Sequence, residues 1–408
     1  MKIICAPDSF KGTLDAVEAA EAIASGVRQV MPYANVDCCP VGDGGDGTLH
    51  ALLVALDGEA ISCRVGGALG EPVDAKLGRF ETGGFAYVES ATAIGLDPDP
   101  LKRDVMNASS RGVGELLLSA CKGYGKRILI GLGGSATNDG GCGMAQALGV
   151  GFFDHSDRRI DTPITGASLH LIDRIDIDTL SSRVAEADVI ALCDVTNPLT
   201  GPNGAAHVYG PQKGANPADV EQLDAGLCHR TAIIRSDLGI DVDPIPGAGA
   251  AGGLGAGLFA FAGASLRSGI DSVLTALDFD HRLTGAALCL TGEGRIDGQS
   301  MSGKACMGIT ARASRLGVPT VALVGQATPD ASNCLDAGLS EIVVIGEGLH
   351  PDESREHAAR LLRTAAARTT EKYLGNGDTM RRSSSEIKQS IERPWHWPSL
   401  SRHSAWAL

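Results

Sequence analysis

The chain has 408 residues, a net charge of −14 and 54 glycines, whereas aromatic residues make up only 4% of it. This length favours two domains, and the glycine content favours many tight turns around a core of small aliphatic side chains. The negative charge argues against a nucleic-acid or anionic-membrane surface, although local cationic side chains can still bind an anionic substrate.

The sequence also limits the compartment and the metal chemistry. The first residues, MKIICAPDSF, begin a strand and show no signal peptide, and no apolar run reaches the roughly 18 residues of a membrane span. The 11 cysteines form no C-x-x-C pair, and the ten histidines have no metal-ligand spacing. We therefore expect a reduced, cytoplasmic enzyme without a zinc site. A homodimer is compatible with the sequence, which does not give the oligomeric state.

Strands and helices alternate along the chain. Hydrophobic periodicity predicts strands over residues 2–5, 36–41, 128–130, 150–153, 189–193, 286–290, 318–324 and 341–345. It predicts helices over residues 13–31, 49–56 and 352–374, the first of them with Thr13 as its N-cap. This alternation predicts an α/β fold with parallel sheets, in which ligands bind outside the carboxyl ends of the strands.

The order of the elements predicts how the domains are arranged. Short right-handed crossovers would place the first two and the last three strands in one sheet. We therefore predict a Rossmann-like α/β domain of residues 1–60 and 277–374, an inserted α/β domain of residues 61–276, and an active site in the cleft. Residues 375–408 contain all three tryptophans and a serine run without periodicity, so we expect a disordered tail there.

A glycine-rich turn follows the strand at 128–130. GLGGSA at 131–136, which includes Gly133, Gly134 and Ser135, matches the dinucleotide pattern G-x-G-x-x-[GA]. However, Asn138 and Asp139 interrupt the helix that a Rossmann fingerprint requires. The glycines allow backbone N–H groups to approach an anion, but the ligand must be inferred from the rest of the chain.

Two further glycine-rich runs resemble nucleotide motifs more weakly. GAGAAG at 247–252 continues through Gly253 and Gly255, and it fits either a tightly packed loop or a backbone site for phosphate. GQSMSGKA at 298–305 misses the P-loop pattern because Ala305 replaces the Ser or Thr that binds Mg²⁺. A turn that places Lys304 near a phosphate is the better interpretation of that second run.

Carboxylates follow several of the predicted strands, namely Asp43, Asp139, Asp194, Glu293 and Asp297. Each fits a helix cap or a turn, but several at one sheet edge would suit Mg²⁺ and a general base. Arg295 and Lys11 are the nearby cations that could bind a carboxylate or phosphate.

Together these segments resemble the bacterial type I glycerate kinase family. The motifs are APDSFKG at 6–12, VGDGGDGT at 41–48, GLGGSATNDGG at 131–141, CDVTNPLTGPNGA at 193–205, YGPQKGA at 209–215, PGAGAAGGLGAG at 246–257 and TGEGRID at 291–297. They occur in the family's order and cover roughly residues 1–374. The resemblance implies a two-domain kinase that transfers the γ-phosphoryl group of ATP to D-glycerate with Mg²⁺, giving 2-phosphoglycerate or, in some glycerate kinases, the 3-phosphate.

Phosphoryl transfer needs positioned substrates and neutralised charge, so each candidate side chain receives a predicted role. Asp194 is the first candidate for the base that accepts the substrate hydroxyl proton, and Asp297 is the second. The predicted binding groups are Arg295, Lys11, Asp8, Ser9 and Asn197 for glycerate; Gly133, Gly134, Ser135, Asn138, Gly252, Gly253, Gly255 and Lys304 for ATP; and Asp139, Asp43 and Glu293 for Mg²⁺. The alternative function is an NAD(P)-dependent oxidoreductase of a small hydroxy acid.

Overall fold

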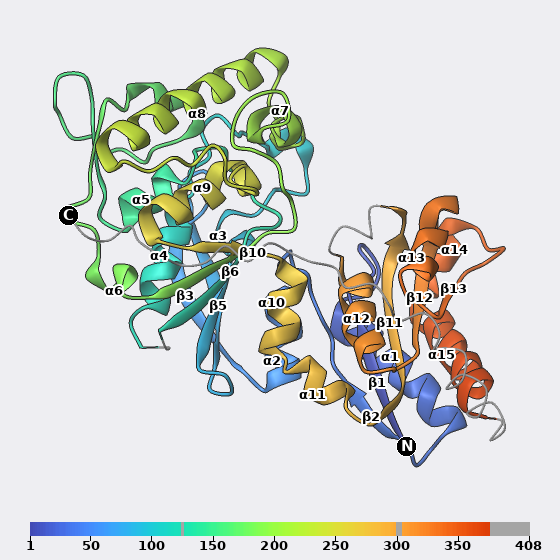
Figure 1. The fold of residues 1–408 in the computed structure, drawn as a ribbon. Helices are drawn as coiled ribbons and strands as arrows, with labels where there is room; N and C mark the ends of the chain where they lie inside the picture. The colour runs from blue at the N-terminus through green and yellow to red at the C-terminus, as the bar shows by residue number, and fades with distance from the viewer. Residues whose placement is uncertain (124–125, 299–303, 376–408) are drawn as a thin grey trace.

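The computed structural model describes residues 1–123, 126–298 and 304–375 (Figure 1). The chain forms two large sheets with helices packed on them and a separate two-stranded sheet, which confirms the predicted α/β fold with parallel strands. The predicted tail, apart from Gly375, and residues 299–303 of the P-loop-like run lie outside the described residues. None of the helices in the described part of the chain has the length and apolar character of a membrane span.

The first sheet is entirely parallel, in the order β13-β12-β11-β1-β2. Its strands are β1 (Lys2–Pro7), β2 (Asn35–Cys38), β11 (Ala286–Ile296), β12 (Thr320–Ala327) and β13 (Glu341–Val344). The sequence predicted that the first two and the last three strands of the chain share one sheet, and this grouping is confirmed. Strand β11 continues past the predicted end at residue 290, which carries Glu293 and Arg295 to the sheet edge.

Alternate residues of β1 face opposite helix layers, as the pleat of a strand requires. Ile3 and Cys5 pack with α1 (Ala16–Val30) and α15 (Ala358–Leu374), whereas Ile4 and Ala6 pack with α10 (Gly269–Ala276) and α12 (Ala305–Arg315). Helix α1 begins later than predicted. Its N-cap is Asp15 and not Thr13, because Asp15 and Glu18 form a reciprocal capping box.

The second sheet is mixed, in the order β10-β9-β6-β5-β4-β3. Strands β5 (Phe85–Glu89), β6 (Arg127–Gly131), β9 (Asp188–Leu192) and β10 (Ser265–Arg267) are parallel, whereas β3 (Glu59–Gly66) and β4 (Pro72–Phe80) are antiparallel. A separate antiparallel pair joins β7 (Gly151–Phe153) and β8 (Arg174–Asp176).

The remaining α-helices are α2 (Thr48–Leu56), α3 (Ala91–Ile94), α4 (Arg111–Ala120), α5 (Cys142–Ala147), α6 (Ser182–Ala185), α7 (Ala205–Tyr209), α8 (Pro217–Leu238), α9 (Ala250–Ala262), α11 (Phe279–Leu283), α13 (Asn333–Asp336) and α14 (Pro351–Glu356).

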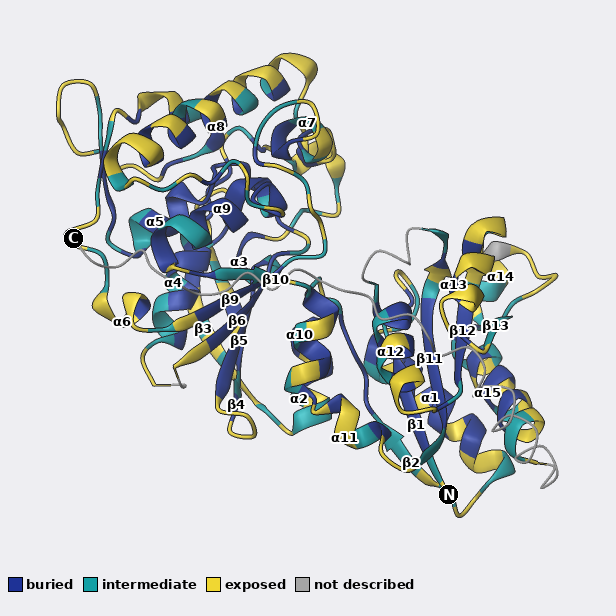
Figure 2. Ribbon diagram, viewed as in Figure 1, coloured by how far each residue is buried: buried dark blue, intermediate teal, exposed yellow. Residues whose placement is uncertain are grey.

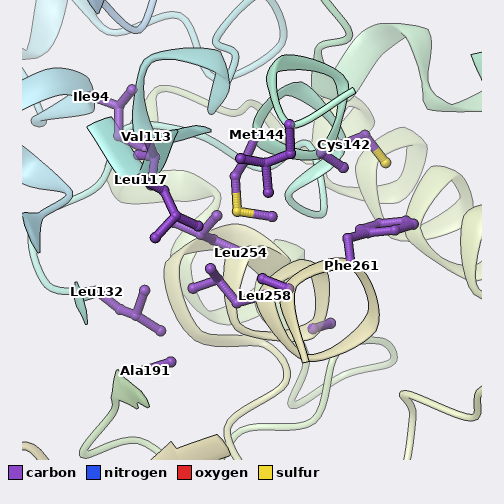
Figure 3. Close-up of a cluster of buried hydrophobic side chains, with 14 of the residues drawn as sticks. Ile94, Val113, Leu117, Leu132, Cys142, Met144, Ala191, Leu254, Leu258 and Phe261 are labelled. Carbon is purple, nitrogen blue, oxygen red and sulfur yellow. The ribbon is translucent and has the colours of Figure 1, made fainter. Parts of the chain in front are cut away.

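One face of the second sheet packs on helices α4, α5 and α9 (Figure 3). The labelled side chains there include Val113 and Leu117 of α4, Met144 of α5, and Leu254 and Phe261 of α9. All five side chains are at most 2% exposed. The central strands of both sheets are buried, whereas the outward faces of α8 and α11 are exposed (Figure 2). The packing of α4, α5 and α9 holds the second sheet in place, and the carboxyl ends of its parallel strands form part of the candidate active site.

The two sheets share a layer of helices. A single hydrophobic cluster contains Ile4 of β1, Leu52 of α2, Tyr87 of β5, Ile270 of α10 and Cys289 of β11. Buried apolar contacts therefore run from one face of the first sheet to one face of the second. The division into domains near residues 60 and 276 stays a prediction.

Candidate active site

Two adjoining cavities lie at the carboxyl ends of the parallel strands. Cavity 1, of about 770 Å³, lies at the edge formed by the ends of β1, β11, β12 and β13. Cavity 2, of about 750 Å³, is lined by the segments that follow β6 and β9 and by the turn before α2. The two cavities share Ser9, Lys11, Thr13 and Asp43 in their walls. Ligands in both cavities would therefore meet at this shared wall.

The segment after β1 supplies a carboxylate to cavity 1. The Asp8 N–H donates to the Gly292 carbonyl at 2.9 Å, which ties the segment to β11, and the Ser9 N–H donates to Asp8 Oδ1 at 2.6 Å. Burial, followed by the nearby Asp43 carboxylate, raises the pKa of Asp8 to about 7, although the Ser9 hydrogen bond opposes this shift. Asp8 therefore lies in a cluster of like charges that a cation would stabilise.

Glu293 of β11 is a buried acid of cavity 1. It is 8% exposed, and its Oε1 atom has no hydrogen-bond partner among the described residues. Burial raises the pKa of Glu293 to about 7, whereas Lys304 lowers it and Asp43 raises it further. An unpaired buried carboxylate oxygen beside Asp8 and Asp43 fits a cation such as Mg²⁺, which prefers one or two carboxylates together with phosphate oxygens. Within the described ranges, no three His, Cys, Asp or Glu side chains form a complete metal cluster.

Four cations line cavity 1, namely Lys11, Arg295, Lys304 and Arg355. Lys304 is the N-cap residue of α12, and its Nζ atom lies 3.4 Å from Asp297 Oδ1. The Arg295 Nε atom lies 3.8 Å from Asp297 Oδ2, while 60% of the Arg295 side chain stays exposed. Asp297 thus lies between two cations and does not line either cavity.

Gly133, Gly134 and Ser135 line cavity 2 directly after β6. Gly134 has a φ of +72°, a left-handed conformation that favours glycine. A second turn, residues 43–47, faces the same cavity. Its shape is fixed by Glu89, whose two carboxylate oxygens accept hydrogen bonds from the N–H groups of Gly47 and Leu49.

Asp194 follows β9 and lines cavity 2. Its Oδ1 atom accepts hydrogen bonds from the Gly269 N–H at 2.8 Å and from Ser268 Oγ at 3.2 Å. No hydrogen bond to Oδ2 is present among the described residues. Burial raises the pKa of Asp194 to about 7, with a further contribution from Asp43, although the two hydrogen bonds lower it. A positioned carboxyl group with a pKa near 7 is suited to accept a proton.

The structure gives Asp139 a structural role. Its side chain is fully buried and lines neither cavity. Oδ2 accepts hydrogen bonds from the N–H and hydroxyl groups of Ser110 and from the Gly143 N–H, and Oδ1 accepts one from the Gly141 N–H. These four bonds occupy both oxygens, so Asp139 anchors the 131–141 loop and is not positioned to bind Mg²⁺. Neighbouring Asn138 is also buried and lines neither cavity.

Gly252, Gly253 and Gly255 are packing residues that line neither cavity, although the preceding Ala250 and Ala251 line cavity 2. Gly252 has a φ of +69°, and a Cβ atom on it would lie 2.0 Å from the Thr137 carbonyl oxygen. The Gly140 N–H donates to the Gly252 carbonyl at 3.0 Å. The two glycine-rich runs that resemble dinucleotide motifs therefore pack against each other, and the second run supports the first.

Asn197 also lies outside both cavities. Its Oδ1 atom accepts a hydrogen bond from the Tyr209 hydroxyl at 2.7 Å, and its Nδ2 atom donates to the Asn203 carbonyl at 2.9 Å. Tyr209 lines cavity 2, so Asn197 positions a cavity residue and does not itself face the space.

Lys213 was not among the site residues predicted from the sequence. It lines cavity 2 and is 4% exposed. Its Nζ atom donates to the Thr137 carbonyl at 2.8 Å and to Ser135 Oγ at 3.2 Å. The segment YGPQKGA at 209–215 contains it, but nothing in that segment alone distinguishes a buried lysine from an exposed one.

Both cavities lie at the carboxyl ends of parallel strands, where α/β folds bind their ligands. Comparisons with known proteins identify the family. The model of the glycerate kinase family matches residues 3–374. The chain belongs to the glycerate kinase family, and it is a kinase.

Individual relatives agree with this assignment. The chain is 44% identical over 351 residues to a glycerate 2-kinase of Escherichia coli K12, which covers 85% of this chain and 92% of that protein. It is 42% identical over 368 residues to a glycerate kinase of Bacillus subtilis 168, with 90% and 96% coverage. A crystal structure from Salmonella typhimurium LT2, described as a proposed glycerate kinase 2, has a TM-score of 0.79 and 39% identity over 91% of this chain and 98% of that chain. These relatives favour the kinase interpretation over the NAD(P)-dependent alternative.

Proposed function

We propose that this chain catalyses the ATP-dependent, Mg²⁺-assisted phosphorylation of D-glycerate to 2-phosphoglycerate. The observation that carries this proposal is the shared wall of Ser9, Lys11, Thr13 and Asp43 between two cavities of similar size. Direct phosphoryl transfer requires the two substrates to approach each other at one point. The shared wall supplies such a point.

Cavity 1 is proposed to bind D-glycerate. Lys11 and Arg295 would bind the substrate carboxylate, with Arg295 able to contact both of its oxygens. Asp8 and Ser9 would contact the hydroxyl groups at the end of β1. Lys304 would neutralise charge in the same cavity, where its Nζ atom already lies beside Asp297.

Cavity 2 is proposed to bind ATP. The backbone of Gly133, Gly134 and Ser135 would contact the phosphate chain at the end of β6. Leu96 and Leu132 supply apolar surface in the same cavity. The phosphate chain would extend from there toward the shared wall.

Asp43 and Glu293 are proposed to hold Mg²⁺ beside Asp8. The unpaired Glu293 Oε1 atom and the mutual repulsion of these carboxylates support this assignment. Magnesium, when bound, neutralises charge on the phosphate oxygens. Asp194 is the proposed base, because Asp43 of the shared wall contributes to its raised pKa and therefore lies near it. Asp297 remains the second candidate.

The test is steady-state ATP turnover with D-glycerate and Mg²⁺, followed by NMR identification of the product. We expect turnover that requires all three components and yields 2-phosphoglycerate. The 3-phosphate would contradict the proposed position of transfer, and no glycerate-dependent turnover would contradict the kinase activity. Thermal stabilisation by NAD(H) and not by Mg²⁺ and ATP would favour the oxidoreductase alternative.

A further inference from the structure

Lys213 is a buried cation at the wall of cavity 2. It belongs to a short 3₁₀ helix, Pro211–Lys213, and its side chain reaches the loop that follows β6. The Thr137 carbonyl and the Ser135 hydroxyl each accept one hydrogen bond from Nζ. An ammonium group has three donors, so one remains after these two bonds.

No carboxylate among the described residues lies within ion-pairing distance of Lys213. Asp139 is the charge that acts on Lys213, but its oxygens already accept hydrogen bonds from Ser110, Gly141 and Gly143. Burial is the main cause that lowers the pKa of Lys213 to about 7, and Asp139 opposes this shift. A buried lysine without a counterion is costly unless a ligand supplies the negative charge.

Asp139 of the 131–141 loop is the charged group that acts on Lys213. The titratable groups that line the same cavity are Lys11, Asp15, Asp43, Asp46, Cys193, Asp194 and Tyr209. Arg103 contacts the 3₁₀ helix of Lys213, where its Nη1 atom donates to the Gln212 carbonyl at 3.0 Å. None of these groups pairs with the ammonium, so the incoming ligand has the strongest influence on its charge.

We propose that Lys213 binds the phosphate chain of ATP in cavity 2 and takes up a proton when that chain binds. This inference rests on the proposed function. It favours phosphate because Lys213 is hydrogen-bonded to Ser135, at the end of the glycine turn whose backbone can approach a phosphate group. The glycerate carboxylate has other partners, Lys11 and Arg295, which line cavity 1.

The direction of the linkage follows from the charge states. Above pH 7 the free protein holds Lys213 largely neutral, and a bound phosphate chain raises its pKa and draws in a proton. At pH 8 binding should therefore take up about one proton at this residue, whereas at pH 6 the lysine is already charged and adds none. Affinity for the phosphate chain should weaken as the pH rises above 7.

The experiment is isothermal titration calorimetry of the full chain with a non-hydrolysable ATP analogue and Mg²⁺, in two buffers of different ionisation enthalpy. At pH 8 the wild type should take up about one proton more than Lys213→Met, and the variant should bind about tenfold or more weakly. Lys213→Arg keeps the charge at every pH, so it should bind without this proton uptake. Lys76→Met is the matched control, because Lys76 is exposed and lines neither cavity.

Two results would overturn the proposal. One is wild-type affinity and proton uptake in Lys213→Met; the other is weakened binding of D-glycerate alone with unchanged binding of the analogue. The wild type by itself also tests the linkage, because absence of proton uptake at pH 8 contradicts it even if a variant fails to fold. ATP turnover with D-glycerate, measured on the same wild-type protein, tests the proposed function separately.

Discussion

In cavity 1 burial acts on two acids, the half-buried Asp8 and the buried Glu293, whereas cavity 2 contains the buried cation Lys213. Burial moves the pKa of each group to about 7, upward for the acids and downward for the lysine. The same desolvation therefore leaves each of these groups short of the opposite charge. Asp8 and Glu293 are suited to gain a cation, and Lys213 is suited to gain an anion.

We expect the largest effect from Asp194, which lines cavity 2 near Asp43 of the shared wall. Asp194→Asn keeps an Oδ1 acceptor for Gly269 and Ser268 but removes the carboxylate that would accept a proton. We expect kcat to fall by roughly 10²–10⁴-fold, with the circular dichroism spectrum unchanged. Turnover close to that of the wild type would exclude Asp194 as the base and leave Asp297 to be tested in the same way.

The scaffold of cavity 2 is tested by Gly252→Ala. The added methyl group would overlap the Thr137 carbonyl at a backbone φ of +69°, so we expect the free energy of unfolding to fall by about 3 kcal/mol. Gly263→Ala is the matched control: its φ is +62°, and nothing lies within 4 Å of the added atom. It should cost only about 1 kcal/mol. Urea unfolding measures both variants. If both lose the same free energy of unfolding, backbone strain determines the effect, and the contact between the two glycine runs does not.

The cation preference of cavity 1 is tested by Glu293→Gln. Loss of the unpaired carboxylate oxygen should raise the Mg²⁺ concentration for half-maximal activity about tenfold. Turnover as a function of free Mg²⁺ measures this shift. Glu115→Gln is a suitable control, because Glu115 pairs with Arg111 and lines neither cavity. An unchanged Mg²⁺ requirement in Glu293→Gln would remove Glu293 from the proposed site.

The smallest effect concerns stability and pH. Asp8, Asp194 and Glu293 have raised pKa values, so they bind more protons in the folded state and should lower stability as the pH rises from about 4 to about 7. Lys213 has a lowered pKa, so its contribution should increase stability as the pH rises from about 7 toward about 10.

Thermal unfolding across this pH range measures both changes. The combined contribution of the four groups should be lowest near pH 7, and Lys213→Met should lose the increase on the alkaline side. A Lys213→Met curve that rises as steeply as that of the wild type would contradict the lowered pKa of this lysine.

The elements and the site differ in how far the sequence could predict them. Periodicity and turn residues predicted the five strands of the first sheet, because each strand is an apolar run that ends in a polar turn. The same local pattern predicted Asp194 and Glu293 after strand ends: Asp194 does follow β9, whereas Glu293 lies within β11, and both line the cavities. These features depend on neighbours in the sequence.

Features that depend on distant contacts could not be predicted in this way. Asp139 and Gly252 resemble ligand-binding residues in the sequence, but the 131–141 loop folds over the glycine run of α9 and buries both of them. Lys213 is a candidate site residue because it is buried against Thr137 and Ser135, which lie 76 and 78 residues away in the sequence. Only the tertiary structure shows which polar residues remain beside a cavity.

The most direct test is a crystal structure of the complex with D-glycerate, Mg²⁺ and a non-hydrolysable ATP analogue. The account predicts the phosphate chain in cavity 2, against Gly133, Gly134, Ser135 and Lys213, and glycerate in cavity 1, with their reacting groups at the shared wall near Asp43. A phosphate chain bound in cavity 1, with cavity 2 free of nucleotide, would contradict it.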